Sequence, residues 1–587
     1  MNAKRAVIAS TSAVLVISAM FLGSSSISTA SKPAFNAALH HQVGDYAGNG
    51  GTLKLGSMRL CDSFDPASSF DLWCGVIFRT YTRNIVSYAG KAGNDSFVLV
   101  PDLARSNPKS SKDFLTWTIH LRKNITWDDG TPLTSDDVKY TFERLFDPDI
   151  VGTVSNETLC LLSDCSSGTP DYLGPYVQAD KDLASIQTPD AHTVEITLRT
   201  PNSRFNSILA IPQFGIVEKA RDQQLRAAGS TYAKKPASSG PYVLSIGDGA
   251  VTFVRNAQWK QSTDSIRVPK VDSMEWSTFQ TADQADDAVL SGVVDLRIDG
   301  GLSGAKRSEV FNNPDYRDSI DQSSSGAVNY LSLISTFKPL DNKNCREAIA
   351  YALNKSDLSK IQGGVEIAPI ARSMISPGIL GGDSSIDPYS SGKDFTGDVE
   401  KAKAKLSKCG YPDGFEVRMA YVNLGIGKAT YESVQQALSR VGIVVDPIPF
   451  ESFADYFSSG IGSPENIVNN DIGLIASSWI PEAGSSSSFW GPIADGRRIK
   501  LRSNLNYASL SNDDINALID SLEGSRANVA SINHKIDRLV MDQVVYIPYV
   551  SDAAILYRRH GLTNVYVQHA LFGEYDIVNV GLSSLTK

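Results

Sequence analysis

The sequence predicts a large α/β protein built from more than one lobe. Its 587 residues exceed what a single hydrophobic core accommodates. Apolar residues make up 42% and charged residues 20% of the chain, an ordinary globular composition that excludes disorder, collagen and coiled coil. Segments with alternating apolar residues, typical of strands, are interleaved with segments whose apolar residues recur at helical spacing. Together these observations favour a mixed α/β fold.

Strand and helix patterns alternate over the first two hundred residues. Strands are expected over 51–56, 117–122 and 194–198, because apolar and polar residues alternate in each. A helix should begin after Thr134, an N-cap residue with a carboxylate three positions later, and should end before Pro148. This mixture of strands and helices is typical of an α/β lobe.

The clearest helices lie in the second half of the chain. Apolar stripes over 344–353 and 399–409 predict two helices, the second of which is closed by Gly410. We expect these two helices to pack against each other. A further helix over 431–441 leads into a strand at 443–445, which is a helix-to-strand unit of α/β type.

Two polar segments interrupt these patterns. Residues 463–470 and the serine run 485–488 lack an apolar stripe. We expect both to be surface loops rather than linkers between domains.

The first thirty residues have the pattern of an export signal. Lys4 and Arg5 precede an uncharged apolar stretch over 6–22, and small residues lead to Ala30. The stretch holds about 17 residues, the lower limit for a bilayer span, so an uncleaved anchor is the alternative. We predict a signal peptide over 1–30 followed by a flexible leader over 31–49, and a protein that is exported to the extracellular space or the cell envelope.

The six cysteines agree with an oxidising compartment. An even number in an exported chain favours disulfides, and six cysteines allow 15 connectivities. Free thiols are the alternative. No metal site is expected, because no Cys-x2-Cys pair occurs and the seven histidines are scattered. Pairing by short separation predicts the disulfides Cys61–Cys74, Cys160–Cys165 and Cys345–Cys409.

The motifs of common enzyme classes are missing from the sequence. It contains no Gly-x-Ser-x-Gly elbow, no phosphate-binding loop, no dinucleotide fingerprint and no His-Glu-x-x-His. No cofactor is predicted. A secreted hydrolase that uses two carboxylates remains an alternative, since such chemistry needs no longer motif. The net charge of −9 argues against a nucleic-acid partner.

Several segments, in order, resemble the family 5 extracellular solute-binding proteins of ABC importers, the group with oligopeptide- and dipeptide-binding members. The strongest likeness is FLTWTIHLRKNITWDDGTPLTSDDVKYTFERLF over 114–146. GGTLKLGS over 50–57, SGPYVL over 239–244 and CREAIAYALNKSDL from Cys345 keep the family's order. The run RTYTRNIVSYAG over 79–90 is similar to actinobacterial members.

The resemblance implies a fold of the periplasmic-binding-protein type II, cluster C. In that fold three lobes form two halves, and hinge strands join the halves around a ligand cleft. Placing the family's segments on this chain puts the hinge near 322 and 551. It assigns lobe I to 50–84, 210–322 and 551–587, lobe II to 85–209 and lobe III to 323–550.

The resemblance also implies a function. It predicts a monomer, not an enzyme, that captures a peptide and delivers it to an ABC importer permease with ATPase subunits. Contact with a membrane would occur only through that permease or an uncleaved signal. Within the same fold, an oligosaccharide or a metal chelate is the alternative ligand, and a signalling receptor without transport is an alternative role.

Ligand-binding residues follow from the same likeness. Trp479 matches a tryptophan near the family's cleft, and Glu482 stands where peptide-binding members carry the acid that takes the ligand's amine. Alternatively, Glu482 is a solvated loop residue, and Trp479 is an ordinary core aromatic, as Trp490 would be. A sugar would instead stack on tryptophans. The other predicted ligand-binding residues are Ile480, Trp490, Phe70, Trp73, Tyr242 and Tyr549.

Overall fold

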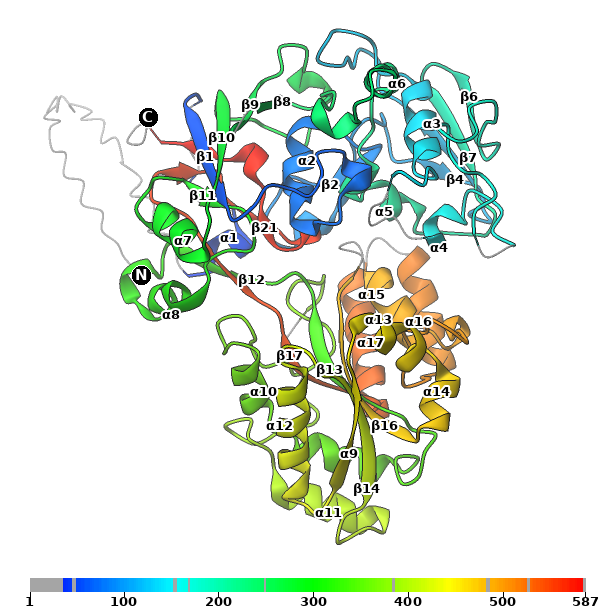
Figure 1. Cartoon of the computed structure of the whole chain (residues 1–587), viewed down its shortest axis with the longest axis vertical. Coiled ribbons are helices and arrows are strands. Elements are labelled where there is room, and N and C mark those ends of the chain that lie inside the picture. The colour runs from blue at the N-terminus through cyan, green and yellow to red at the C-terminus, as the bar shows by residue number, and fades with distance from the viewer. Residues whose placement is uncertain are drawn as a thin grey trace, which may run out of the picture.

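The chain folds into two α/β halves, which lie above and below each other in Figure 1. We call residues 35–323 with 554–583 the upper half and residues 328–551 the lower half. None of the described helices is long and apolar enough to cross a membrane. The predicted signal peptide lies outside the described residues. The computed structural model describes residues 35–44, 49–150, 156–166, 169–247, 250–382, 386–481, 486–524 and 528–583.

The first sheet of the upper half is mixed. Its strand order is β11-β1-β10-β9-β8, with β1 parallel to both of its neighbours and the remaining pairs antiparallel. Leu53 and Leu55 of β1 are fully buried, as their alternation predicts. The elements are β1 (Thr52–Ser57), β8 (Tyr242–Gly247), β9 (Ala250–Arg255), β10 (Ser273–Thr278), β11 (Leu296–Arg297), α7 (Ala282–Leu290) and α8 (Gly304–Asn312).

A four-stranded antiparallel sheet of order β4-β5-β7-β6 forms the other end of the upper half. Helix α3 packs beside it and begins with the predicted capping box, in which the Thr134 backbone N–H donates to Asp137 Oδ2 at 2.9 Å. The elements are β2 (Val86–Tyr88), β3 (Leu99–Pro101), β4 (Lys109–Ser110), β5 (Thr116–His120), β6 (Ile186–Asp190), β7 (Thr193–Thr197), α3 (Ser135–Arg144), α4 (Asn156–Leu159), α5 (Phe205–Leu209) and α6 (Lys219–Ala227).

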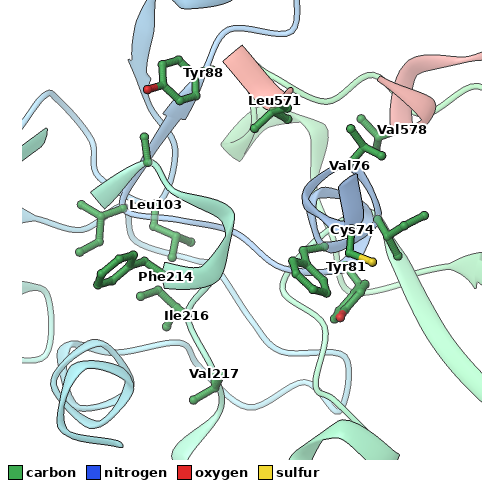
Figure 2. Packing of buried hydrophobic residues seen from close by; sticks show 14 of the residues in the cluster. Cys74, Val76, Tyr81, Tyr88, Leu103, Phe214, Ile216, Val217, Leu571 and Val578 are labelled. Atoms are coloured by element: carbon green, nitrogen blue, oxygen red, sulfur yellow. The ribbon is translucent and has the colours of Figure 1, made fainter. Parts of the chain in front are cut away.

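The core of the upper half is built around α2 (Gly75–Tyr81), all of whose residues are buried. Figure 2 shows Val76 of this helix near Leu571 and Val578 of the C-terminal segment. The C-terminal residues therefore complete a core that the N-terminal residues begin. This segment contains β19 (Leu562–Thr563), β20 (Val567–Gln568), β21 (Glu574–Tyr575) and β22 (Gly581–Leu582).

The lower half has a five-stranded sheet of order β15-β14-β16-β13-β17. Strands β14, β15 and β16 run parallel, whereas β13 is antiparallel to β16 and β17. The strands are β13 (Val328–Leu333), β14 (Glu416–Val422), β15 (Val444–Phe450), β16 (Ile472–Trp479) and β17 (Tyr546–Ser551), and the helices are α9 (Lys343–Ala352), α10 (Lys355–Ile361), α11 (Val399–Cys409), α12 (Gly427–Ser439), α13 (Phe453–Asp455), α14 (Pro464–Asn469), α15 (Ser486–Ala494), α16 (Asp513–Gly524) and α17 (Val529–Gln543).

Helices α9 and α11 pack against each other, as their apolar stripes predict. Gly410 closes α11 with a φ of 91°, a left-handed conformation that glycine adopts without strain. The disulfides join the cysteines in sequence order: Cys61 to Cys74, Cys160 to Cys165 and Cys345 to Cys409.

Three segments expected to be irregular contain helices. The predicted loop 463–470 forms α14, because Ser463 caps it, Pro464 opens it and Ile467 is buried. The serine run enters α15, where the small side chains of Ser486 and Ser487 fit a buried position. The leader contains α1 (Ala37–His40), which packs on the body through two buried alanines.

Candidate ligand-binding cleft

The described chain passes between the halves in two places. Strand β12 (Ile320–Ser323) pairs with β18 (Ala554–Tyr557) in the upper half, and β13 pairs with β17 in the lower half. Residues 324–327 and 552–553 therefore form two adjacent connections, close to the predicted hinge positions. Hinges between packed bodies are usually formed by a few loop or element-terminal residues of this kind.

Asp552 links the two connections. Its carboxylate accepts hydrogen bonds from Ser324 Oγ at 3.0 Å and from the backbone N–H of Ala327 at 3.1 Å, and Ser325 also donates to it. Burial raises the pKa of this carboxyl group above its ordinary value. The hinge is thus a hydrogen-bonded unit rather than two independent strands.

The predicted residues Trp479 and Ile480 lie at the carboxyl end of β16, and both are partly buried. The Trp479 Nε1–H donates to the backbone oxygen of Phe489 at 2.9 Å. Pro481 follows Ile480 and lies close to Gly326 in the hinge. A Cβ atom added to Gly326 would lie 3.2 Å from Pro481 Cγ. The segment that follows Trp479 therefore packs against the hinge connection at Gly326.

Phe70 and Trp73 lie in the upper half, in the loop that follows β1. Phe70 is 54% exposed. Trp73 is partly buried and packs edge to face against Trp276, with 6.0 Å between the ring centroids. In the part of the chain that the structure describes, no hydrogen bond or ring contact joins either residue to Trp479. An exposed aromatic ring such as Phe70 retains surface for a ligand.

Three predicted ligand-binding residues lie in protein cores. Trp490 is 0% exposed and its Nε1–H donates to Asn533 Oδ1 at 3.2 Å. Tyr242 is also fully buried, and Tyr549 is 3% exposed in β17. In this structure the apolar cores of the two halves cover all three side chains, and their role as ligand-binding residues stays a prediction. Glu482 lies outside the described residues.

A cavity of about 470 Å³ lies between the halves, away from the hinge. Its volume is in the range of small-molecule binding sites. The upper wall comes from α4, α5 and their flanking loops, and the lower wall from α15 and the chain after it, which face each other in Figure 1. Residues lining it are Thr158, Leu161, Thr200, Pro201, Asn202, Arg204, Ser207, Ile208, Ile211, Ser488, Pro492, Arg497, Arg498, Ile499, Lys500, Ser503 and Leu505.

None of these lining residues was predicted from the sequence. One available signal was the basic run Arg497-Arg498-Ile499-Lys500, which has no role in a helix stripe or strand alternation. Arg204 carries no comparable signal, because it is a single basic residue in an ordinary loop. Only the approach of the two halves brings it opposite the basic run.

Two α/β bodies joined by a double-strand hinge, with a cavity lined from both, define a hinged binding protein. The family model of the bacterial extracellular solute-binding proteins, family 5, matches residues 98–500. The chain belongs to this family. Its fold is the periplasmic-binding-protein type II fold of cluster C, as the sequence resemblance implied.

Known proteins are similar over much of the chain. The solved structure of the clavulanic acid biosynthesis oligopeptide binding protein 2 has a TM-score of 0.80 and 31% identity, and the match covers 94% of this chain and 99% of that chain. A periplasmic binding protein DppA from Helicobacter pylori, solved with the peptide STSA, has a TM-score of 0.59 and 20% identity over 91% and 99% of the chains, which supports the fold.

Among curated proteins, the glutathione-binding protein GsiB of Salmonella choleraesuis strain SC-B67 is 28% identical over 393 residues. The match covers 65% of this chain and 66% of that relative, slightly less than two thirds of its length.

Proposed function

We propose that this protein is an exported receptor that captures a peptide between its two halves and delivers it to an ABC permease with ATPase subunits. It acts as a monomer and carries out no reaction on its ligand. The proposal rests on membership of a solute-binding family. The relatives named for oligopeptides and glutathione, itself a tripeptide, favour peptides over sugars or metal chelates.

One structural observation carries the proposal: the cavity is lined from both halves, while the described chain crosses between them only at the hinge. A ligand that contacts both walls stabilises the closed arrangement, because only differential affinity for one state shifts the population. Capture and closure are then the same event. A permease can distinguish the loaded receptor by its closed shape.

The experiment begins with the native protein. The chain from Ser31 is produced in an exporting host and purified without denaturant, and its bound molecules are released by acid and identified by mass spectrometry. We expect short peptides. Sugars or a metal complex would replace the peptide assignment but leave the receptor role intact.

Calorimetric titration then tests the released peptide against two reference ligands, glutathione and maltotriose. A peptide receptor binds the recovered peptide with one site and gives no heat with maltotriose. Incubation with excess peptide serves as the control for catalysis, because a hydrolase would produce cleavage products beyond one equivalent of protein. Such products would contradict the proposal.

A further inference from the structure

A segment of the lower half reaches the upper half beside the hinge. This segment, residues 363–371, follows α10, and we call it the strap. The backbone N–H of Ala553, in the hinge, donates to the backbone oxygen of Ile367 at 2.8 Å, and that of Ser551, in β17, donates to Pro369 at 3.0 Å. The strap is therefore attached both to the lower half and to one of the two hinge connections.

Two glycines form the turn with which the strap begins. Gly363 and Gly364 have φ values of 106° and 89°, which glycine adopts without strain. The backbone N–H of Gly364 donates to the backbone oxygen of Ser359 in α10 at 2.8 Å, and its own backbone oxygen accepts the N–H of Ala368 at 2.8 Å. These bonds fix the position of Glu366, which lies inside the turn, relative to the lower half.

Glu366 meets helix α8 of the upper half. Its Oε2 accepts a hydrogen bond from Ser308 Oγ at 3.0 Å and lies 3.6 Å from Arg307 Nε. Arg307 Nη2 also donates to the backbone oxygen of Gly363 at 3.4 Å. Two consecutive residues of α8 thus hold the strap through one carboxylate and one backbone oxygen.

Strand β12 adds a second point of attachment in the upper half. Gln322 Nε2 donates to the backbone oxygen of Val365 at 2.8 Å and to that of Glu366 at 3.1 Å. We call Arg307, Ser308 and Gln322, together with residues 363–366 of the strap, the latch. The latch joins the two halves through side chains that lie outside the hinge connections.

The ion pair of the latch is shielded from water but incompletely formed. The side chains of Arg307 and Glu366 are each 15% exposed, so salt screens the pair less than a surface pair. Among the described residues, Arg307 Nε has no hydrogen-bond partner, because 3.6 Å is too long for such a bond. A closer approach of α8 to the strap would complete the bond.

The latch and the ligand cavity lie on opposite sides of the hinge. In Figure 1, α8 lies to the left of β12 and β17, whereas α5 and α15, which contribute to the cavity walls, lie to the right. When two bodies rotate about a hinge between them, surfaces on its opposite sides move in opposite senses. Closing the cavity therefore separates α8 from the strap, and opening it brings them together.

We propose that the latch is a brake on closure, which stabilises the open receptor and breaks when a ligand closes the cavity. The inference rests on the proposed capture by closure and identifies the contacts that regulate it. The apparent affinity of a receptor falls with the fraction of molecules in the binding-competent state. Because the latch lies away from the cavity, it lowers the affinity for every ligand by the same factor.

Single-molecule fluorescence energy transfer measures the open and closed populations without a ligand. Bound peptide is first removed by unfolding in guanidinium chloride and refolding with the disulfides intact. Dyes are attached at Glu195→Cys on β7 and Val468→Cys on α14, exposed positions in different halves on the cavity side of the hinge in Figure 1. Glu366→Gln removes the charge and keeps the shape of the side chain, and it should raise the ratio of closed to open molecules at least threefold.

Two further variants test whether the ion pair itself is responsible. Arg307→Gln breaks the pair from the upper half and should also raise the ratio at least threefold. The exchanged pair, Arg307→Glu with Glu366→Arg, should return the ratio towards the unmodified value, because attraction is restored. Independent structural effects at the two sites would instead add up in the double variant. A ratio in the double variant above that of both single variants would contradict the latch.

The matched control is on the same helix. Lys306 precedes Arg307 and pairs with Asp287 at 3.1 Å within the upper half. Lys306→Gln removes the same charge as Arg307→Gln but breaks no contact between the halves. It should leave the ratio of closed to open molecules unchanged, and an equal increase in the control would show that the loss of charge on α8, not the latch, is responsible.

Calorimetry with the recovered peptide tests the link between latch and affinity. While the closed state is the minor one, each latch variant should bind the peptide more tightly by the factor with which its closed-to-open ratio rises. Weaker binding would show that the latch favours the closed state, the reverse of the inference. If no peptide is recovered or bound, the proposed peptide function fails, but the ratios measured without a ligand still decide about the latch. Unchanged ratios in both single variants would overturn the latch alone.

Discussion

Glu574 is an acidic residue that the fold buries in β21. Burial raises the pKa of its carboxyl group to about 8, and the nearby Asp299 carboxylate adds to the increase, whereas Arg297 opposes it. The folded protein therefore keeps a proton on Glu574 at pH values where the unfolded chain has lost it. The free energy of unfolding must then fall as the pH rises from about 4.5 towards 8.

Glu574→Gln should remove this pH dependence, because the amide is uncharged at all pH values. At pH 9 we expect the variant to be more stable than the unmodified protein by about 2 kcal/mol or more, since each unit of pKa shift corresponds to about 1.4 kcal/mol. At pH 4 the two proteins should be equally stable, or the variant slightly less so. Urea unfolding at both pH values measures the difference.

Glu400→Gln is the matched control, because Glu400 is an exposed carboxylate on α11. It should follow the unmodified protein at both pH values. A Glu574→Gln variant that is no more stable than the control at pH 9 would show that the folded protein tolerates the charged form of Glu574.

At the scale of elements, the pair α9 and α11 shows how sequence pattern and covalent chemistry act together. Apolar stripes pack the two helices, and the Cys345–Cys409 disulfide closes a loop with a separation of 64 residues. The Cys160–Cys165 disulfide spans 5 residues. In the chain-entropy model, the stabilisation by a disulfide grows with the loop that it closes.

Removing the long-range disulfide with Cys345→Ala and Cys409→Ala should lower the free energy of unfolding by about 4 kcal/mol. The matched pair Cys160→Ala and Cys165→Ala should cost about 2 kcal/mol. Denaturant unfolding of the oxidised proteins checks both values. If both variants lose the same free energy of unfolding, the length of the closed loop does not decide how much each disulfide stabilises the protein.

At the scale of the whole molecule, the hinge decides how the two walls of the cavity meet. Gly326 lies in one connection with a φ of 96°, and a Cβ there would come within 3.3 Å of Pro481 and Ile379. Only glycine combines this backbone conformation with such close packing without strain. The hinge connection at Gly326 is therefore packed closely against Pro481, which follows the Trp479 strand.

Gly326→Ala should weaken the binding of the recovered peptide at least tenfold and reduce the compaction that the peptide causes in small-angle X-ray scattering. Gly300→Ala is the matched control: Gly300 has nearly the same φ, 95°, but no atom within 4 Å of an added Cβ. Both variants carry the same backbone strain, so only contacts at the hinge distinguish them. Equal binding by the two variants would contradict a mechanical role for the Gly326 contact.

Local patterns predicted the secondary structure well wherever the signal was periodic. The capping box at Thr134, the strand alternation at Leu53 and Leu55, and the Gly410 helix end are all present. Helix α14 was missed because its Ser-Pro-Glu start signal precedes only a short helix with one buried residue. Short elements gain most of their stability from tertiary contacts, which a local pattern does not contain.

The sequence by itself determined the export pattern, the α/β class and the family likeness, because each depends on residues close together in the chain or on an ordered set of motifs, whereas the cysteine pairing was one choice among 15 connectivities. The burial of Trp490, the hinge network of Asp552 and the opposition of Arg204 to Lys500 were decided only by the tertiary structure. The hinge network and the opposition of Arg204 to Lys500 join residues hundreds of positions apart, and Trp490 meets Asn533, 43 positions further along the chain. Their distances follow from the packing of the two halves, which no local periodicity encodes.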